Sequence, residues 1–326
     1  MLDELKFVVG AVAKKDFVPE LTHIKIRNGW AQGFNGQISS ATRIELDLNV
    51  MPWATEMVEA VSACKETIAL SVTPAGKLAV KSGKFKCFVP CLDMTDDALQ
   101  AFPLPEGQDI PVDEQFTEML KALEPFMSTD ASRPWAQGIM LDSRSAFATN
   151  NVMLAQYWHG MEFPHRVTIP AEAVKEILKR KVSPTSIQMT HNSLTVWFGR
   201  ERWLRTQLIE DGFPEQIYTI IEAQGEPGLP LDTYPGFFEA VETLKRFTNL
   251  TADIFFCGGV LSTTREAEDG AHVDVPNIPE NMCFNAEHLL LLKDCAATLD
   301  LTPFPKPCRF WGTNQRLRGI FTGKAQ

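Results

Sequence analysis

One strand-like pattern occurs three times in this chain at a constant spacing, and this repeat limits the possible folds more than any other feature. Each copy consists of an apolar run, a polar turn and a second strand-like run, and the copies begin at Ile24, Ile139 and Ile254. Their starts lie 139 − 24 = 115 and 254 − 139 = 115 residues apart. A fixed period of this kind indicates tandem copies of one structural unit. We therefore predict three similar domains.

A second pattern has nearly the same period. It is a short strand followed by a helix, and the strands are residues 50–52, 167–170 and 282–285. The last residues of these strands lie 170 − 52 = 118 and 285 − 170 = 115 residues apart. Two of the strands end in proline, which suits the start of a helix because its missing N–H is not needed there. Two independent patterns thus predict the same repeat.

Each repeat is predicted to hold two amphipathic helices between strands. In residues 171–181, Val174, Ile177 and Leu178 share one face, the spacing of a helix that lies on a sheet. Asn-Gly or Asp-Gly pairs at 28–29, 35–36 and 211–212 are typical of hairpin turns. The predicted fold class is therefore α+β, with two helices on a β-sheet layer in each domain. The expected helices are residues 2–12, 53–65, 116–123, 171–181, 238–247 and 286–298.

Proline-rich segments mark the expected boundaries between the repeats. They are residues 103–111 and 225–230, and they are interpreted as linkers. The predicted domains are residues 1–108, 109–225 and 226–326.

The charge of the chain is acidic throughout. The 31 basic and 41 acidic residues give a net charge of −10, and the three predicted domains carry 11 − 13 = −2, 11 − 15 = −4 and 9 − 13 = −4. Nucleic-acid-binding domains usually carry an excess of basic residues. By itself, this balance argues against a nucleic-acid partner.

Sequence signatures of catalysis and of metal or nucleotide binding are absent. The chain has no Gly-x-x-x-x-Gly-Lys loop, no Gly-x-Gly-x-x-Gly after a strand, no Gly-x-Ser-x-Gly and no His-Glu-x-x-His. Cys87 and Cys91 lack a second ligand pair at zinc-finger spacing, so they are interpreted as strand residues. We expect no enzyme activity, no metal and no cofactor. A hydrolase or transferase with a site dispersed along the chain stays a minor alternative, because one sequence would not reveal it.

The expected compartment is the cytoplasm. No apolar run approaches the roughly 18 residues of a membrane span, and Asp3 and Glu4 stand where a secretory signal needs a basic start. Seven cysteines, an odd number spread over a long chain, favour reduced thiols over a disulfide framework.

Basic residues recur on the predicted helices, while acidic residues are expected to concentrate in strands and loops. One reading is local, since cations near a helix C-terminus complement the helix dipole by about 0.3–1 kcal/mol each. The other is a basic helical surface on an acidic protein. The cluster at the second helix of the middle domain is Lys175, Lys179, Arg180 and Lys181, and further candidates are Lys121, Lys245, Arg246 and Lys293.

The chain resembles the bacterial sliding clamp, the beta subunit of DNA polymerase III. Residues 167–178 are similar to the strand and second helix of the family's middle domain, and residues 208–214 (LIEDGFP) to the signature that follows. The resemblance covers nearly the whole chain and implies the same three domains, in a compact, divergent form of the kind that a bacterial virus encodes. Further similar segments are residues 81–85, 133–138, 148–155, 283–290 and 319–326.

The resemblance implies a ring. In this family two three-domain chains join head to tail, helices line a central hole and sheets form the outer wall. Such a ring encircles double-stranded DNA, so it needs only weak, sequence-independent phosphate contacts from Lys and Arg on the inner helices. The implied function is that of a processivity factor, which tethers a DNA polymerase and its clamp loader to DNA and catalyses nothing. The family's opening β-strand has no counterpart here, which predicts a first sheet that is one strand shorter.

The resemblance also implies site residues. Lys15 and Arg133 match basic DNA-contacting positions of the family. Family partners dock a short peptide in an apolar pocket between the second and third domains. The family's Thr-Asp-Gly-His-Arg-Leu and Met-Pro-Met are here residues 149–154 (TNNVML) and 322–324 (TGK), so the pocket's place carries over better than its peptide preference. The matching positions are Ala136, Thr149, Asn151, Val152, Leu154, Pro214, Thr219, Ile320 and Thr322.

A homodimer interface is expected at one strand of the first domain. Residues 84–90 alternate, with Phe85, Cys87 and Val89 on one side and Lys84, Lys86 and Phe88 on the other. An edge strand must be paired or protected, so we expect this one to pair with the third domain of a partner chain. The main alternative is a monomeric module that keeps the clamp fold and binds clamp-interacting peptides without encircling DNA.

Overall fold

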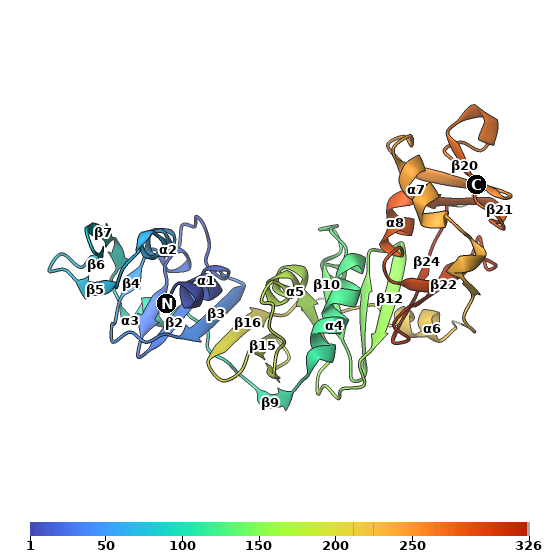
Figure 1. Cartoon of the computed structure of the whole chain (residues 1–326). Coiled ribbons are helices and arrows are strands. Elements are labelled where there is room, and N and C mark those ends of the chain that lie inside the picture. The colour runs from blue at the N-terminus through green and yellow to red at the C-terminus, as the bar shows by residue number, and fades with distance from the viewer. Residues whose placement is uncertain (211, 224, 325–326) are drawn as a thin grey trace. The chain divides into compact units, whose positions relative to one another are not determined.

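The computed structural model describes residues 1–210, 212–223 and 225–324. Asp211, which belongs to the third expected hairpin turn and to the clamp-like signature, lies outside the described residues, as do the last two residues of the C-terminal match. The chain divides into two compact units. The first unit holds residues 1–117 and 172–208, and the second holds residues 118–171 and 209–326 (Figure 1).

The first unit is built on a seven-stranded antiparallel sheet with the order β1-β2-β3-β16-β15-β14-β9. A three-stranded sheet, β5-β6-β7, and the pair β4-β8 accompany it. Its helices are α1 (Leu2–Val9), α2 (Ala54–Ala63), α3 (Asp96–Gln100) and α5 (Ala171–Leu178), and α4 (Glu114–Leu123) begins in its range and ends in that of the second unit. Its strands are β1 (Lys25–Arg27), β2 (Trp30–Phe34), β3 (Ile38–Arg43), β4 (Met51–Pro52), β5 (Ala69–Val72), β6 (Leu78–Ser82), β7 (Phe85–Val89), β8 (Cys91–Leu92), β9 (Gln108–Pro111), β14 (Ser186–Met189), β15 (Ser193–Trp197) and β16 (Arg202–Gln207).

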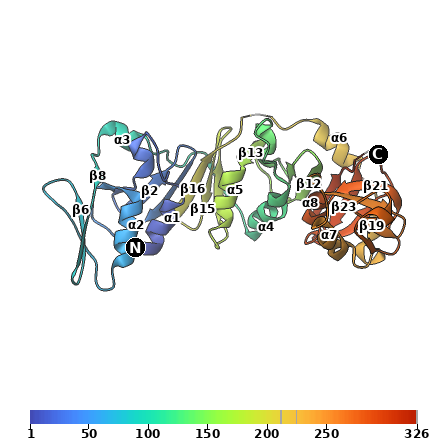
Figure 2. The same cartoon turned by 90° about the horizontal axis from the view of Figure 1, so that it is seen from above.

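Local sequence explains how α1 meets this sheet. The turn at Asn28 and Gly29 has positive φ at both residues, 52° and 71°, which closes the β1–β2 hairpin as predicted. Leu5 and Val8 of α1 are fully buried. A Cβ on Gly33 of β2 would lie 2.9 Å from the Val8 carbonyl oxygen, so only glycine lets the helix pack this closely. As a result, α1 contacts β2 and β3 and lies beside α2 (Figures 1 and 2).

The second unit is built on an eight-stranded antiparallel sheet with the order β13-β10-β11-β12-β24-β23-β22-β17, and it also holds the four-stranded sheet β20-β19-β18-β21. Its own helices are α6 (Gln216–Glu222), α7 (Phe237–Lys245) and α8 (Ala286–Leu291). Its strands are β10 (Gly138–Leu141), β11 (Ser145–Thr149), β12 (Met153–Trp158), β13 (Val167–Pro170), β17 (Leu229–Pro230), β18 (Asp253–Cys257), β19 (Val260–Ser262), β20 (His272–Asp274), β21 (Glu280–Asn285), β22 (Ala296–Asp300), β23 (Cys308–Gly312) and β24 (Leu317–Phe321).

Helices α7 and α8 contact each other in this unit. The Asn285 side chain caps α8 by accepting hydrogen bonds from the N–H groups of Glu287 and His288, at 2.8 and 3.2 Å. The helix expected over residues 286–298 is too long. It ends at Leu291 because residues 296–300 form β22 and pair with β23.

The other predicted helices and the repeated strand markers are confirmed, but the predicted linkers are not simple linkers. Residues 108–111 form β9 and pair with β14, and residues 229–230 form β17 and pair with β22. Each segment is an edge strand of its sheet, a place that tolerates proline because one row of N–H groups needs no partner. The three-domain division stays a prediction. Both large sheets join strands from two predicted domains, through the pairs β3–β16 and β12–β24.

Three chemical features bear on function. All seven cysteines are free thiols, in agreement with the expected absence of disulfides. Within residues 1–210, 212–223 and 225–324, no group of three or more His, Cys, Asp or Glu residues is placed to hold a metal ion. No helix in this part of the chain has the length and hydrophobicity to cross a membrane.

Candidate functional sites

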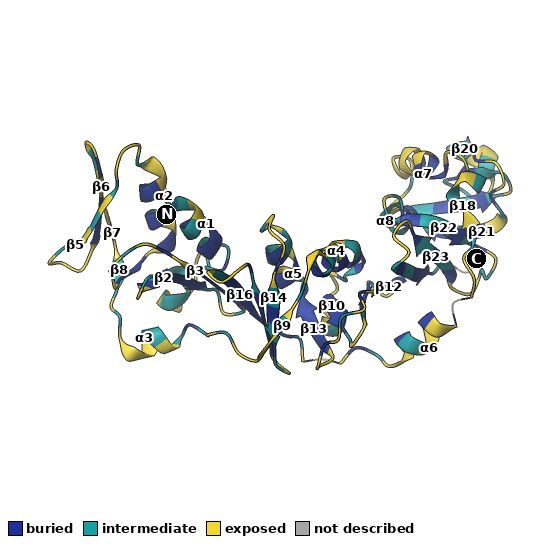
Figure 3. Ribbon diagram, turned by 60° about the horizontal axis from the view of Figure 1, so that its bottom comes forward, coloured by how far each residue is buried: buried dark blue, intermediate teal, exposed yellow. Residues whose placement is uncertain are grey.

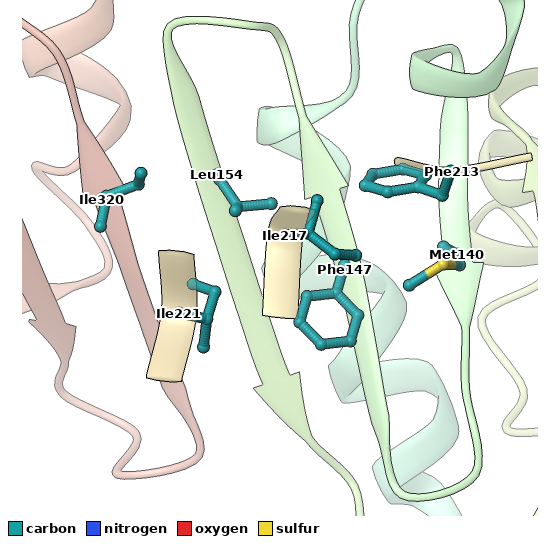
Figure 4. Close-up of a cluster of buried hydrophobic side chains, with 7 residues drawn as sticks. All are labelled: Met140, Phe147, Leu154, Phe213, Ile217, Ile221 and Ile320. Carbon is teal, nitrogen blue, oxygen red and sulfur yellow. The ribbon is translucent and has the colours of Figure 1, made fainter. Parts of the chain in front are cut away.

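An apolar cluster lies on the large sheet of the second unit, where α6 packs on it (Figure 4). Ile217 and Ile221, one helical turn apart on α6, point toward the strands. The sheet supplies side chains from four neighbouring strands, β10, β11, β12 and β24. These are Met140, Phe147, Leu154 and Ile320, and Phe213 joins them from the segment before α6.

Polar contacts hold α6 in this position. The Tyr218 hydroxyl donates a hydrogen bond to Asp142, and burial together with this bond raises the pKa of Tyr218. The Arg166 guanidinium lies 5.3 Å from the centre of the Tyr218 ring and donates hydrogen bonds to Glu215 at 2.5 Å and to the Phe213 carbonyl at 2.7 Å. The segment from residue 213 to 221 is therefore fixed by side chains as well as by its apolar face.

The structure brings the expected pocket residues together in the second unit. Leu154 of β12 pairs with Thr149 of β11 on one side and with Ile320 of β24 on the other. The Thr322 N–H donates to the Val152 carbonyl at 3.0 Å, so the C-terminal segment lies against the β11–β12 turn. Ala136 is fully buried, Thr149 is buried, Val152, Pro214 and Thr322 are half-buried, and Asn151 and Thr219 are exposed.

Sequence reasoning named only Leu154 and Ile320 among the seven buried residues of this cluster. Helix α6 is exposed over much of its surface (Figure 3), and Thr219, which the resemblance assigns to the pocket, is one of its exposed residues. Ile217 and Ile221 supply the contact with the sheet instead. Their spacing of four residues was the available signal, but two apolar residues between turn-rich segments form too short a pattern to predict a helix.

Eight of the ten predicted DNA-contacting cations lie at exposed positions, and Lys293 and Arg180 do not. In the first unit the exposed cations are Lys15, Lys175, Lys179 and Lys181. In the second unit they are Lys121, Arg133, Lys245 and Arg246. Lys293 is half-buried. Three of these cations form ion pairs with helical carboxylates: Lys179 with Glu176 at 2.5 Å, Lys245 with Glu287 at 3.2 Å and Lys293 with Glu242 at 2.7 Å.

Arg180 is the most buried of the predicted cations and requires a correction. Its side chain is 9% exposed, and its guanidinium donates a hydrogen bond to the Phe7 carbonyl at 2.7 Å. The same group lies 4.3 Å from the centre of the Phe7 ring and 3.3 Å from Glu176. Arg180 therefore joins α5 to the end of α1, and we remove it from the set of surface DNA contacts.

The expected segregation of charge onto the helices is also wrong in its strict form. Helix α2 carries Glu56 and Glu59 and no Lys or Arg. Helix α5 carries Glu172 and Glu176 beside its lysine. Basic residues on helices are thus a subset of a mixed surface, because solvent-facing helical positions accept both signs of charge.

The expected interface strand β7 is an edge strand of the sheet β5-β6-β7. Its side chains alternate as predicted. Phe85 and Cys87 are half-buried and Val89 is fully buried, whereas Lys86 is exposed and Phe88 is 46% exposed, and the flanking Lys84 is also exposed. In the second unit, Phe247 after α7 is 64% exposed and Leu250 is fully exposed. Each unit thus presents apolar side chains to solvent.

No protein-family model matches the chain, and no curated protein sequence matches it either. Solved structures do match it over its whole length. The DNA polymerase III beta subunit of Pseudomonas aeruginosa is similar with a TM-score of 0.81 at 16% identity, and the DNA polymerase sliding clamp of Bacillus subtilis with a TM-score of 0.78 at 17% identity. A sliding clamp from Bartonella birtlesii, solved bound to griselimycin, is similar with a TM-score of 0.81 at 17% identity. Each comparison covers 100% of this chain and 97% of the other. The chain therefore has the fold of the bacterial DNA polymerase III beta sliding clamps.

Proposed function

We propose that this chain is a DNA sliding clamp, a protein that encircles duplex DNA and tethers a polymerase to it without catalysing a reaction. The observation that carries the proposal is the full-length match to bacterial sliding clamps, which leaves only 3% of their chains uncovered. We infer that the protein acts in the cytoplasm with the replicating DNA and needs no cofactor.

The ring requires two copies joined head to tail. We assign one side of the joint to β7, which has an edge available for pairing and carries the exposed Phe88. The other side is the apolar pair Phe247 and Leu250 on the second unit of the partner copy. Burial of these side chains would stabilise the joint by about 25 cal/mol for each Å² of apolar surface that is removed from water.

DNA would contact the exposed cations of the two units. The contacts need only be weak, because closure around the duplex holds the protein in place. The chain as a whole has a net charge of −10, so the rest of its surface repels the phosphates. This repulsion favours DNA contact at the few exposed cations.

Partner proteins would dock a short apolar peptide beside α6. The support is the apolar cluster of the second unit. The half-buried Pro214 follows Phe213 of this cluster, and Val152 and Thr322 each lie two residues from a cluster member, Leu154 and Ile320. Val152→Glu should weaken peptide binding by placing a charge beside the cluster, while Lys306→Glu, at an exposed position of the same unit, should not. Equal peptide affinity of the two variants in a fluorescence-anisotropy titration would remove Val152 from the site.

Native mass spectrometry combined with retention on DNA tests the whole proposal. A ring has a mass of 2 × 36.4 = 72.8 kDa, and it should stay on nicked circular DNA at salt concentrations that strip it from the same DNA after linearisation. A species of 36.4 kDa that binds clamp-interacting peptides but is not retained on circles would instead identify a monomeric binding module.

A further inference from the structure

A cleft rich in arginine lies in the first unit, beside the end of α1 and the β15–β16 turn. Its volume is about 580 Å³, which is in the range of small-molecule sites. Three arginines and one glutamate line it, a balance of 3 − 1 = +2 on a chain with a net charge of −10. The arginines are Arg180, Arg200 and Arg202, and Glu201 is the acid.

The carboxylates near this cleft do not neutralise it fully. Glu176, the partner of Arg180, also pairs with Lys179 at 2.5 Å. Glu4 lies 3.4 Å from Arg202 and is held more closely by the N-terminal ammonium, which lowers the pKa of Glu4. Arg200 is exposed and forms no ion pair within the described part of the chain.

Two buried aromatic rings line the cleft, and two of its cations lie against one of them. Phe7 and Phe198 are buried and meet edge to face at 5.9 Å between ring centres. The guanidinium groups of Arg180 and Arg202 lie 4.3 and 5.6 Å from the centre of the Phe7 ring. The Nε atom of Arg180 is buried and has no hydrogen-bond partner among the described residues. Two like charges on one ring, with an unsatisfied donor beside them, favour a multiply charged anion.

The mouth of the cleft leaves space for an organic group beside a bound anion. A Cβ added to Gly199 would meet nothing within 4 Å, and the side chain of Val182 is 61% exposed. An organic group attached to the anion would therefore find apolar surface beside the arginines.

We propose that this cleft binds the phosphate of a nucleotide, with Arg200 and Arg202 as the ligands of the phosphate and Val182 against the base or sugar. Guanidinium groups match phosphate oxygens in geometry and bind them by charge-assisted, bidentate hydrogen bonds. The phosphate has two possible sources, a phosphodiester of a DNA strand or the monoester of a free nucleotide or strand end. The site goes beyond the clamp function, because a single chain that never closes into a ring would still bind the nucleotide.

Isothermal titration of the whole protein with four probes tests this site. The probes are inorganic phosphate, deoxyadenosine monophosphate, a dinucleoside with one internal phosphodiester, and deoxyadenosine, which has no phosphate. The monophosphate should bind more tightly than inorganic phosphate, and deoxyadenosine should not bind. Binding of the dinucleoside as tight as that of the monophosphate assigns the site to a DNA backbone, and binding of the monophosphate alone assigns it to a free nucleotide or strand end.

Arg200→Ala is the decisive variant, since Arg200 is exposed and its loss should not affect folding. Loss of one charged hydrogen-bond donor should weaken monophosphate binding by about tenfold or more. Arg27→Ala removes another exposed arginine of the same unit and should bind as the wild type does. The proposal is overturned if no phosphate probe binds at millimolar concentration, if deoxyadenosine binds as tightly as its monophosphate, or if Arg200→Ala binds the monophosphate as tightly as Arg27→Ala does. Retention on circular DNA reports on the ring separately.

Discussion

Arg180 shows how one residue can be misjudged from its place in a sequence. It stands in a run of cations, Lys179-Arg180-Lys181, and all three were expected to face DNA. The run follows Leu178, the last residue of α5, and the backbone turns there, with a positive φ of 51° at Lys181. Only the Arg180 side chain points toward α1 and is buried there. The sequence shows the helix and its charges, but the contact with Phe7 depends on a residue 173 positions away.

Arg180→Met should lower the stability of the first unit. The variant loses a charge-assisted hydrogen bond to a buried carbonyl, which costs about 1.5–3 kcal/mol. Lys179→Met is the matched control, because the Lys179 side chain is 68% exposed and an exposed ion pair contributes about 0–1 kcal/mol. Thermal melts followed by circular dichroism measure both. A melting temperature of Arg180→Met equal to that of the control would contradict the structural role.

His159 should make the second unit less stable in acid. It is buried, its Nδ1 accepts the Met161 N–H at 3.1 Å, and burial lowers its pKa below the usual value of 6.5. The unfolded chain therefore takes up the proton first, so this stability is complete above about pH 6.5 and is lost as the pH falls from there toward the lower folded pKa. His159→Asn keeps an acceptor for the Met161 N–H and should flatten the stability profile between about pH 7 and 5. An unchanged profile in urea unfolding would assign the acid sensitivity to other groups, such as His288, whose pKa burial also lowers.

Among the elements, β7 was predicted from its sequence and α6 was not. The alternation of apolar and polar residues in β7 has a period of two, which only a strand satisfies. Helix α6 has seven residues, of which only Ile217 and Ile221 are buried, and this is too short a pattern to recognise between turn signals. Strands β9 and β17 were not predicted for a related reason. Their proline residues indicate linkers unless it is known that the segments lie at the edge of a sheet.

Charge reversals on the apolar joint should separate the two copies. Phe88→Glu on β7 and Phe247→Glu after α7 should each give monomers, because each puts a carboxylate into a surface that must lose water on assembly. Phe17→Glu is the control, since Phe17 is fully exposed in the first unit and lies outside the proposed joint. Light scattering measures the mass, and a dimer that survives both changes would rule out this joint.

The end of α5 should contribute to DNA affinity through charge alone. Lys175→Glu, Lys179→Glu and Lys181→Glu together should reduce DNA binding and lower its dependence on salt, since each lost phosphate contact changes the slope of log K against log salt by about 0.9. Lys179 should contribute least because Glu176 already pairs with it. Lys65→Glu, Lys77→Glu and Lys306→Glu change the net charge equally at other exposed positions. If both triple variants lose the same affinity, net charge rather than this helix governs binding.

For the whole molecule, the repeat of 115 residues predicted the order of elements along the chain, and the division into three domains drawn from it stays a prediction. The β3–β16 and β12–β24 pairs make each large sheet from strands of two predicted domains, so the compact units cut through the middle repeat. A sequence period reports similar local structure, whereas strand pairing across a boundary depends on edges that only the folded chain brings together.

The net charge of −10, which by itself argues against a DNA partner, is compatible with a protein that encloses DNA. It does not exclude a DNA partner if the duplex is held by enclosure, since affinity then comes from topology and the exposed cations need only guide the contact. Enclosure is the central claim of the proposed function, and it requires two chains to form a closed ring. Electron-microscopy images of the purified protein test it most directly. We predict rings of two chains around a hole wide enough for a DNA duplex, and particles of a single chain without a hole would contradict the account.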